Sequence, residues 1–255
     1  MKAVILAGGL GTRMREETEF KPKPMVEVGG KPVLWHIMKI LSSQGVNDFV
    51  ICAGYKAEVI RDYFLNLKSR NLDFTVSYEG SGSIEFHGGF AEDSWRVTVA
   101  DTGPLTMTGG RINAVEKYVE GERFFATYGD GIANVNLQQL IKSHESSKAV
   151  ATLTTTSPVS RFGVVKTSPS GMVETFLEKP QSSELVNIGY FIMEPEVFSY
   201  LDSNSTLEQE PLNRLALEGK LNSYHHEGFW QPMDTQREAQ MLNEHWSKGA
   251  PWKIW

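Results

Sequence analysis

A glycine-rich segment directly follows the first apolar run of the chain, and its residue types suit phosphate binding. From Gly8 to Arg13 it reads Gly-Gly-Leu-Gly-Thr-Arg. Glycines let the backbone approach an anion and point N–H groups at it, and the Arg13 guanidinium can hold two phosphate oxygens at once. The segment therefore indicates phosphate binding, although a glycine-rich turn without a ligand has the same composition.

Two familiar phosphate-binding motifs do not fit this segment. The dinucleotide fingerprint needs Gly-x-Gly-x-x-Gly, and counting from Gly9 puts Met14 at the third glycine position. A P-loop closes with Gly-Lys-Ser/Thr, and no such tripeptide follows these glycines. The spacing argues against a nicotinamide-dependent oxidoreductase and against a P-loop enzyme.

A stiff, basic stretch lies shortly after the glycines. It reads Lys21-Pro22-Lys23-Pro24-Met25, and its two prolines hold the lysines extended. Together with Arg13, such lysines suit a triphosphate whose leaving pyrophosphate must be stabilised. Lys23 is the stronger candidate, since Lys21 fits an exposed loop lysine equally well.

Two aspartates are candidates for holding a metal ion. Asp130 lies between Gly129 and Gly131, after an apolar run, and Asp234 is expected near another strand end. Carboxylate oxygens beside substrate phosphates are the ligands that Mg²⁺ takes in proteins. The alternative for Asp130 is a turn aspartate that accepts hydrogen bonds from nearby N–H groups.

The chain resembles the sugar-phosphate nucleotidylyltransferase family in a series of segments that occur in the family's order. Besides the glycine segment and Pro-Lys-Pro-Met, the matching segments are Tyr128–Gly131, Phe162–Val165, Glu178–Pro180, Asn187–Gly189 and Phe229–Thr235. The resemblance implies that a sugar-phosphate oxygen attacks the α-phosphorus of a nucleoside triphosphate and expels pyrophosphate. It also implies Mg²⁺ as the cofactor.

The resemblance carries residue roles onto matching positions. It implies that Arg13, Lys23 and Asp130 are catalytic and that Asp130 and Asp234 hold the metal. The nucleotide-binding set that it implies is Leu6, Ala7, Gly8, Gly9, Gly11, Thr12, Arg13, Lys23, Thr108, Arg111, Tyr128 and Gly129. The implied sugar-phosphate set is Gly163, Glu178, Lys179 and Asn187, with Gly189 on the same wall.

The base specificity depends on fewer residues. Met107–Arg111, Phe229–Asp234 and Ala250–Trp255 resemble the cytidylyl-transferring branch of the family. That branch uses CTP and glucose 1-phosphate, and its product, CDP-glucose, leads to deoxysugars of bacterial surface polysaccharide. Arg111 could donate to cytosine O2 or N3 and Thr108 could complete the contacts, although Arg111 could instead open an exposed helix. Thymidylyl or uridylyl transfer, or a non-catalytic nucleotide-sugar-binding protein, stay open as alternatives.

The elements that must position these residues alternate between strands and helices. This alternation predicts an α/β fold with a Rossmann-like, mixed but mostly parallel central sheet flanked by helices, and a smaller α+β sugar-binding part in the C-terminal half. We expect one domain, in which about residues 1–156 bind the nucleotide and about 157–255 bind the sugar. Expected strands are 2–7, 48–53, 72–78, 95–99, 123–128, 149–156, 162–167, 172–177, 188–193 and 220–225. Expected helices are 33–44, 57–67, 112–119, 137–146, 195–201, 207–217 and 235–246.

Bulk properties exclude other classes of protein. The 255 residues carry a formal net charge of −6 and a pI near 5.6, which gives no basic footprint for nucleic acid. No apolar run approaches the roughly 20 residues that span a bilayer. The single cysteine, Cys52, suits the cytoplasm. We also expect a homo-oligomer, with the tail that carries Trp252 and Trp255 docking on a neighbouring subunit.

Overall fold

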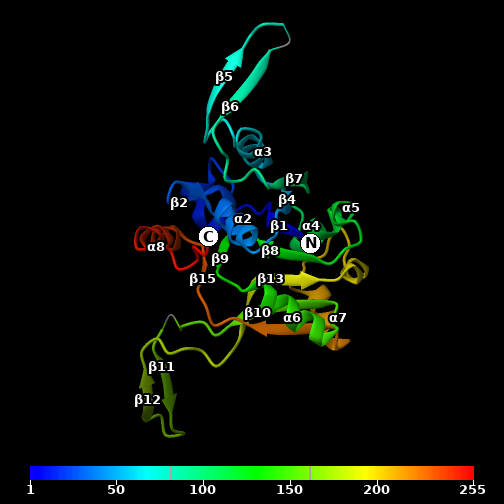
Figure 1. Ribbon diagram of the computed structural model, residues 1–255. Coiled ribbons are helices and arrows are strands. Elements are labelled where there is room, and N and C mark those ends of the chain that lie inside the picture. The colour runs from blue at the N-terminus through cyan, green and yellow to red at the C-terminus, as the bar shows by residue number, and fades with distance from the viewer. Residues whose placement is uncertain (81, 161) are drawn as a thin grey trace.

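The computed structural model describes residues 1–80, 82–160 and 162–255, and a seven-stranded sheet forms its centre (Figure 1). Across the sheet the strands run β14 (Leu221–His225), β10 (Ala151–Thr156), β13 (Val186–Met193), β8 (Phe124–Tyr128), β1 (Lys2–Ala7), β4 (Asp48–Ala53) and β7 (Arg96–Asp101). β8, β1, β4 and β7 are parallel, and only β13 runs antiparallel to its neighbours in the sheet. The predicted mixed, mostly parallel sheet is confirmed.

Both faces of the sheet are covered, as the continuous apolar runs of its central strands require. Alternate residues of β1 point to opposite faces: Ala3 and Ile5 belong to one hydrophobic cluster, and Val4 and Leu6 belong to the other. On the first face pack α2 (Val33–Ser43), α3 (Ala57–Leu65), α6 (Leu137–Ser147) and α8 (Gln236–Ser247). On the second pack α4 (Thr108–Ala114), α5 (Glu116–Val119) and α7 (Glu210–Leu217).

The parallel strands end at one edge of the sheet, which brings distant segments together. In the register of the sheet, Ala7 pairs with Ala53, and Leu6 pairs with Tyr128. The glycine segment that follows β1 therefore lies beside the segments that follow β4 and β8. This is the edge at which ligands bind in open α/β sheets.

Two hairpins extend away from the body of the molecule (Figure 1). The predicted hairpin around the 168–171 turn is confirmed as β11 (Val164–Thr167) paired with β12 (Val173–Leu177). The strand expected over 72–78 exists as β5 (Asp73–Ser77), but it pairs with the unexpected β6 (Ser83–His87) outside the central sheet. Its residues are largely exposed, so its apolar pattern did not mark a buried strand.

Shorter elements complete the chain. Two small ladders pair β2 (Glu27–Val28) with β3 (Lys31–Pro32) and β9 (Gly131–Ala133) with β15 (Trp230–Pro232). A short α1 (Arg15–Thr18) follows the 3₁₀ turn Thr12–Met14, and a second 3₁₀ turn spans Lys23–Met25. The expected helix over 195–201 is a 3₁₀ segment, Pro195–Tyr200. The helix expected over 112–119 begins earlier, at Thr108, and is interrupted at Val115.

The C-terminal tail folds back on its own chain. The Trp252 side chain is fully buried, and its ring stacks on that of Trp246. The centroids of the Trp252 and His36 rings are 5.9 Å apart. Trp255 packs edge-on against Trp35. The expectation that this tail docks on a neighbour is wrong for Trp252, because α2 and α8 already cover its indole.

No helix within the described part of the chain combines the length and the apolar character needed to cross a membrane.

Candidate active site

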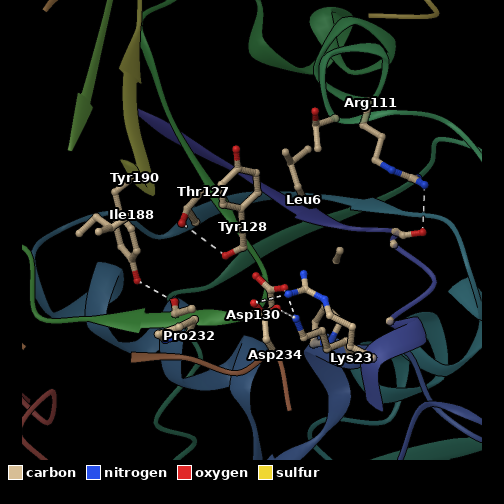
Figure 2. Close-up of a pocket in the computed structure, with 18 of the residues that line it drawn as sticks. Leu6, Lys23, Arg111, Thr127, Tyr128, Asp130, Ile188, Tyr190, Pro232 and Asp234 are labelled. Carbon is tan, nitrogen blue, oxygen red and sulfur yellow. Dashed lines mark hydrogen bonds and ion pairs between the residues drawn. The ribbon is translucent and has the colours of Figure 1, made fainter. Parts of the chain in front are cut away.

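A cleft of about 500 Å³ opens at the carboxyl edge of the sheet (Figure 2). Its walls come from the ends of β1, β8 and β13, from the two 3₁₀ turns and from the start of α4. Among the described residues it is lined by all of the expected nucleotide-binding set except Gly129, together with Asp130, Asn187 and Asp234. Gly129 lies just behind the wall, where its N–H donates to the Leu6 carbonyl.

Four charged side chains meet at the floor of the cleft. The Lys23 ammonium lies 2.6 Å from Asp130 Oδ2 and 2.5 Å from Asp234 Oδ1. Arg13 Nη1 lies 2.9 Å from the other oxygen of Asp234. Figure 2 shows Lys23, Asp130 and Asp234 pointing toward one another. Two cations and two carboxylates that are far apart in the sequence therefore form one cluster.

Local pairing explains how the two aspartates come together. Gly131 in β9 pairs with Pro232 in β15, which places the residues just outside this ladder side by side. The Met233 N–H donates to the Asp130 carbonyl at 2.8 Å and closes the pair. Beyond Asp234, a capping box formed by Thr235 and Glu238 starts α8. The carboxylates are therefore fixed by backbone structure on both segments.

The charges of the cluster support one another. Burial alone would raise the pKa of Asp234, but Lys23 and Arg13 outweigh burial and hold that pKa below its usual range. Lys23 is itself buried to all but 8% of its surface. The cluster therefore keeps the Asp234 carboxylate ionised at the floor of the cleft at neutral pH.

Arg111 ties the loops of the cleft together. Its Nη2 donates to the Gly8 carbonyl at 2.9 Å, and its Nη1 donates to Thr102 Oγ1 at 2.6 Å and to the Gly103 carbonyl at 2.8 Å. The side chain is 4% exposed, so the alternative of an exposed helix start is wrong. Within the described residues, Nη1 and Nη2 make all of the hydrogen bonds of this guanidinium, and Nε makes none.

The close approach of Arg111 leaves no room for a side chain at position 8, which explains the glycine there. A Cβ on Gly8 would lie 2.0 Å from Arg111 Nη1, a separation that only a displaced guanidinium could relieve. The sequence indicated a close approach of backbone to phosphate at Gly8. The structure shows a close approach of an arginine to the same position.

Tyr128 stands on the opposite side of the cleft, and its neighbours hold it in place. Its ring packs on Gly189, where a Cβ would lie 2.0 Å from Tyr128 Cδ2 and where φ is +81°. Its hydroxyl donates to Glu208, whose second carboxylate oxygen accepts from Thr108 at 2.6 Å. Burial, reinforced by the charge of Glu208, raises the pKa of Tyr128. Glu208 was missed by sequence analysis because it belongs to no motif and reaches the site only through the tertiary fold.

The expected sugar-phosphate residues fall into two groups. Asn187 lines the first cleft, and Asn187 and Lys179 both line an adjoining cleft of about 1330 Å³. Gly163 and Glu178 lie beside each other at the base of the β11–β12 hairpin, where a Cβ on Gly163 would be 3.2 Å from Glu178 Oε2. Lys21 is not brought to the cluster, since it lines a separate, smaller cavity near Tyr63.

Comparison with known proteins identifies the family. The model of the family described as "Nucleotidyl transferase" matches residues 2–235 of this chain. The chain belongs to the nucleotidyl transferase family. The resemblance to sugar-phosphate nucleotidylyltransferases that the sequence motifs indicated is confirmed.

Two curated members of the nucleotidyl transferase family match over the full length of both chains. The glucose-1-phosphate cytidylyltransferase of Salmonella typhi is 49% identical to this chain. The probable glucose-1-phosphate cytidylyltransferase of Bacillus subtilis is 44% identical. Among solved structures, HddC from Yersinia pseudotuberculosis aligns over 96% of this chain and 99% of its own, with a TM-score of 0.71 and 22% identity. That structure supports the shared fold alone.

Proposed function

We propose that this protein transfers the cytidylyl group of CTP to glucose 1-phosphate, giving CDP-glucose and pyrophosphate. The observation that carries the proposal is the Lys23 ammonium, set within 2.6 Å of Asp130 and 2.5 Å of Asp234 beside the glycine segment. The full-length similarity to a glucose-1-phosphate cytidylyltransferase at 49% identity supports the choice of substrates.

The reaction needs charge neutralisation and alignment rather than a covalent nucleophile. An oxygen of the sugar phosphate attacks the α-phosphorus of CTP, the bond from that phosphorus to the β-phosphate oxygen breaks, and pyrophosphate leaves with the electron pair. The glycine segment and Arg13 bind the triphosphate, and Lys23 stabilises the negative charge that gathers on the reacting phosphates. Because Lys23 is buried, its charge is screened little by water.

The carboxylates of the cluster fit a divalent cation. Asp130 and Asp234 already share one cation, the Lys23 ammonium, so both face the same position. Within the described ranges, no group of three or more acidic, histidine or cysteine side chains gathers as a complete metal cage. Mg²⁺ suits such a site, since it takes one or two carboxylates and fills its remaining positions with water and substrate phosphate. Bound there, it would neutralise phosphate charge.

The sugar phosphate is proposed to occupy the adjoining cleft. That cleft shares Asn187, Trp230 and Pro232 with the first, so a ligand in it reaches the floor where Asp234 lies. Lys179 is proposed to contact the phosphate and Glu178 the sugar hydroxyls, with Gly163 and Asn187 beside them. In this arrangement, residues 1–156 bind most of the nucleotide and residues 157–255 bind the sugar.

Cytosine is proposed to lie between Tyr128 and Arg111, with Thr108 at its edge. Thymidylyl or uridylyl transfer would use the same charged residues at the floor of the cleft. The contacts of Tyr128, Arg111 and Thr108 with the base are therefore what would distinguish those activities from the proposed one. A non-catalytic binding protein is disfavoured because Arg13, Lys23, Asp130 and Asp234 are all present and in contact.

The setting of the protein is proposed from fewer observations. The single cysteine, Cys52, is unpaired and fully buried, and burial raises the pKa of its thiol to about 12, which suits a protein of the reducing cytoplasm. Exposed apolar side chains on both hairpins, such as Ile84 and Phe176, support a homo-oligomer. The expected place in the cell is the supply of CDP-glucose for surface-polysaccharide sugars.

The product identifies the reaction. The protein is incubated with CTP, glucose 1-phosphate and Mg²⁺, and the phosphorus NMR spectrum is followed. We expect the signals of CTP and the sugar phosphate to be replaced by those of a nucleoside diphosphate sugar and pyrophosphate. Release of inorganic phosphate without a diphosphate sugar would show a different reaction.

A further inference from the structure

Glu208 lies in the segment before α7 and binds two residues of the cleft wall. Thr108 Oγ1 donates to its Oε2 at 2.6 Å, and the Tyr128 hydroxyl donates to its Oε1. Both partners line the cleft, whereas Glu208 does not belong to its described lining. The Glu208 carboxylate is exposed to solvent beside the cleft, and it holds the hydroxyls of two residues that line the cleft.

These contacts fix the direction of the two hydroxyl hydrogens. A carboxylate at neutral pH offers only lone pairs, and each hydroxyl has only one hydrogen to donate. With both hydrogens directed at Glu208, Tyr128 and Thr108 can offer only lone pairs to the cleft. One lone pair of Thr108 Oγ1 already accepts from the Leu207 N–H at 2.9 Å. The wall is therefore polarised as a hydrogen-bond acceptor.

The wall has little freedom to change this polarity by moving. Gly189 leaves room for the Tyr128 ring only because it lacks a Cβ, so the ring packs directly against the Gly189 backbone. Asn187 supports that backbone, since its Oδ1 accepts from the Gly189 N–H at 2.9 Å. Thr108 is the first residue of α4 and is fixed by the helix that it begins.

We propose that Glu208 sets the base selectivity of the enzyme by keeping the hydroxyls of Tyr128 and Thr108 as acceptors. Cytosine presents an amino group, which donates to such a wall, whereas uracil and thymine present a carbonyl in the same place and meet lone pairs. The inference rests on the proposed function, because it takes a pyrimidine nucleotide as the ligand of this cleft. Glu208 acts through its two partners and is a positioning residue.

Glu208→Gln tests the proposal with almost no change of shape. The amide group donates hydrogens of its own, so one hydroxyl accepts from it and turns its own hydrogen toward the cleft. We expect the ratio of kcat/KM for CTP to that for UTP to fall about tenfold, roughly the worth of one mispaired hydrogen bond. Glu210→Gln, two residues away, is the matched control, because that carboxylate contacts only Arg214 in the described structure. Its ratio should stay at the wild-type value.

Other outcomes overturn the proposal. An equal fall with both nucleotides would make Glu208 a structural brace, and an unchanged ratio would remove it from base selection. Direct calorimetry of CTP and UTP binding to the wild type and to both variants separates this proposal from the reaction itself. If no nucleotide is turned over, the proposed function fails, and the ratio of the two dissociation constants still decides whether Glu208 selects the base.

Discussion

At the scale of single residues, the cleft floor combines groups that stabilise one another and suit phosphate chemistry. Lys23 is buried against two carboxylates, and Arg13 contacts one of them from the solvent side. An uncompensated buried charge is costly, so each member of the cluster depends on its partners. Removing one charge should therefore change the site more than removing a paired charge on the surface.

Asp130→Asn should reduce turnover by on the order of 10²-fold or more, because the proposed Mg²⁺ site would lose an anionic ligand and Lys23 would lose one of its partners. The measurement is the steady-state rate of pyrophosphate release at increasing Mg²⁺ concentrations. Asp62→Asn, which removes a surface partner of Arg70, is the control and should keep the wild-type rate. Near-normal activity of Asp130→Asn at ordinary Mg²⁺ would exclude Asp130 from the site.

Which residues line the candidate site was predictable where a motif carried them, and not where the fold alone brings a residue to the site. Arg13, Lys23 and Asp234 belong to recognisable segments, and the structure brings them together. Glu208 has no sequence signal. Its hydrogen bond with Tyr128 joins residues 80 positions apart and depends on the path of the segment that leads into α7. For Arg111, the sequence suggested a ligand contact, but it could not show that Gly8, Thr102 and Gly103 would take most of its donors.

At the scale of elements, the site depends on loops that are tied across the edge of the sheet. The Arg111 guanidinium joins the segment after β1 to the segment after β7 through its hydrogen bonds to the carbonyls of Gly8 and Gly103. Because α4 supplies this arginine, the position of one helix sets the spacing of two loops. A change at Arg111 should therefore affect both binding and stability.

Arg111→Leu should weaken nucleotide binding and lower stability together. The substitution removes the Arg111 hydrogen bonds to the carbonyls of Gly8 and Gly103. The Gly8 carbonyl still accepts from the Tyr55 N–H at 3.1 Å, so the main loss falls on the partly buried Gly103 carbonyl, at a cost of about 1–3 kcal/mol. Titration calorimetry with CTP and urea unfolding measure the two effects. Arg96→Leu, an exposed arginine paired with Asp48, is the control and should change neither. Intact nucleotide affinity and preference in Arg111→Leu would refute the proposed base contact.

Elements were predicted well where burial imposed a pattern. The seven strands of the central sheet were all expected. Apolar residues record burial in most of them, whereas β14 is a partly exposed edge strand. The partner of β5 was not expected, because both strands of that hairpin are exposed and carry no burial pattern. The 3₁₀ form of Pro195–Tyr200 was also missed, since proline and apolar spacing suit an α-helix start equally well.

At the scale of the whole molecule, the C-terminal tail packs on α2 through a buried histidine, His36. The His36 Nε2 lies 2.8 Å from the Val28 carbonyl, so this nitrogen carries the proton, and Nδ1 faces the Trp252 indole N–H at 3.4 Å. Burial is the largest cause that lowers the pKa of His36 to about 4, and the Val28 hydrogen bond opposes it only in part. The imidazole is therefore neutral in the folded protein.

This histidine should make the protein less stable in acid. The unfolded chain takes up the proton near pH 6.5 and the folded chain near 4, so stability is complete above pH 6.5 and falls as the pH drops toward 4. The full loss is about 3 kcal/mol, of which about 2 kcal/mol is reached at pH 5. His144 and His226, whose pKa values burial also lowers, act in the same direction.

Urea unfolding at pH 7 and pH 5 measures this effect as a difference in the free energy of unfolding. His36→Gln should reduce the difference, whereas His87→Gln, on the exposed β5–β6 hairpin, should leave it unchanged. An equal pH dependence in the wild type and in His36→Gln would show that the buried imidazole is not its source.

The most direct test of the central claim is the initial rate of pyrophosphate release from glucose 1-phosphate with CTP, UTP, dTTP, GTP or ATP, each with Mg²⁺ and with EDTA. We predict rapid release with CTP, much slower release with the other nucleotides, and none in EDTA. A preference for dTTP or UTP would contradict the cytosine assignment while keeping the charged floor of the cleft. Absence of release with every nucleotide would contradict the proposed reaction itself.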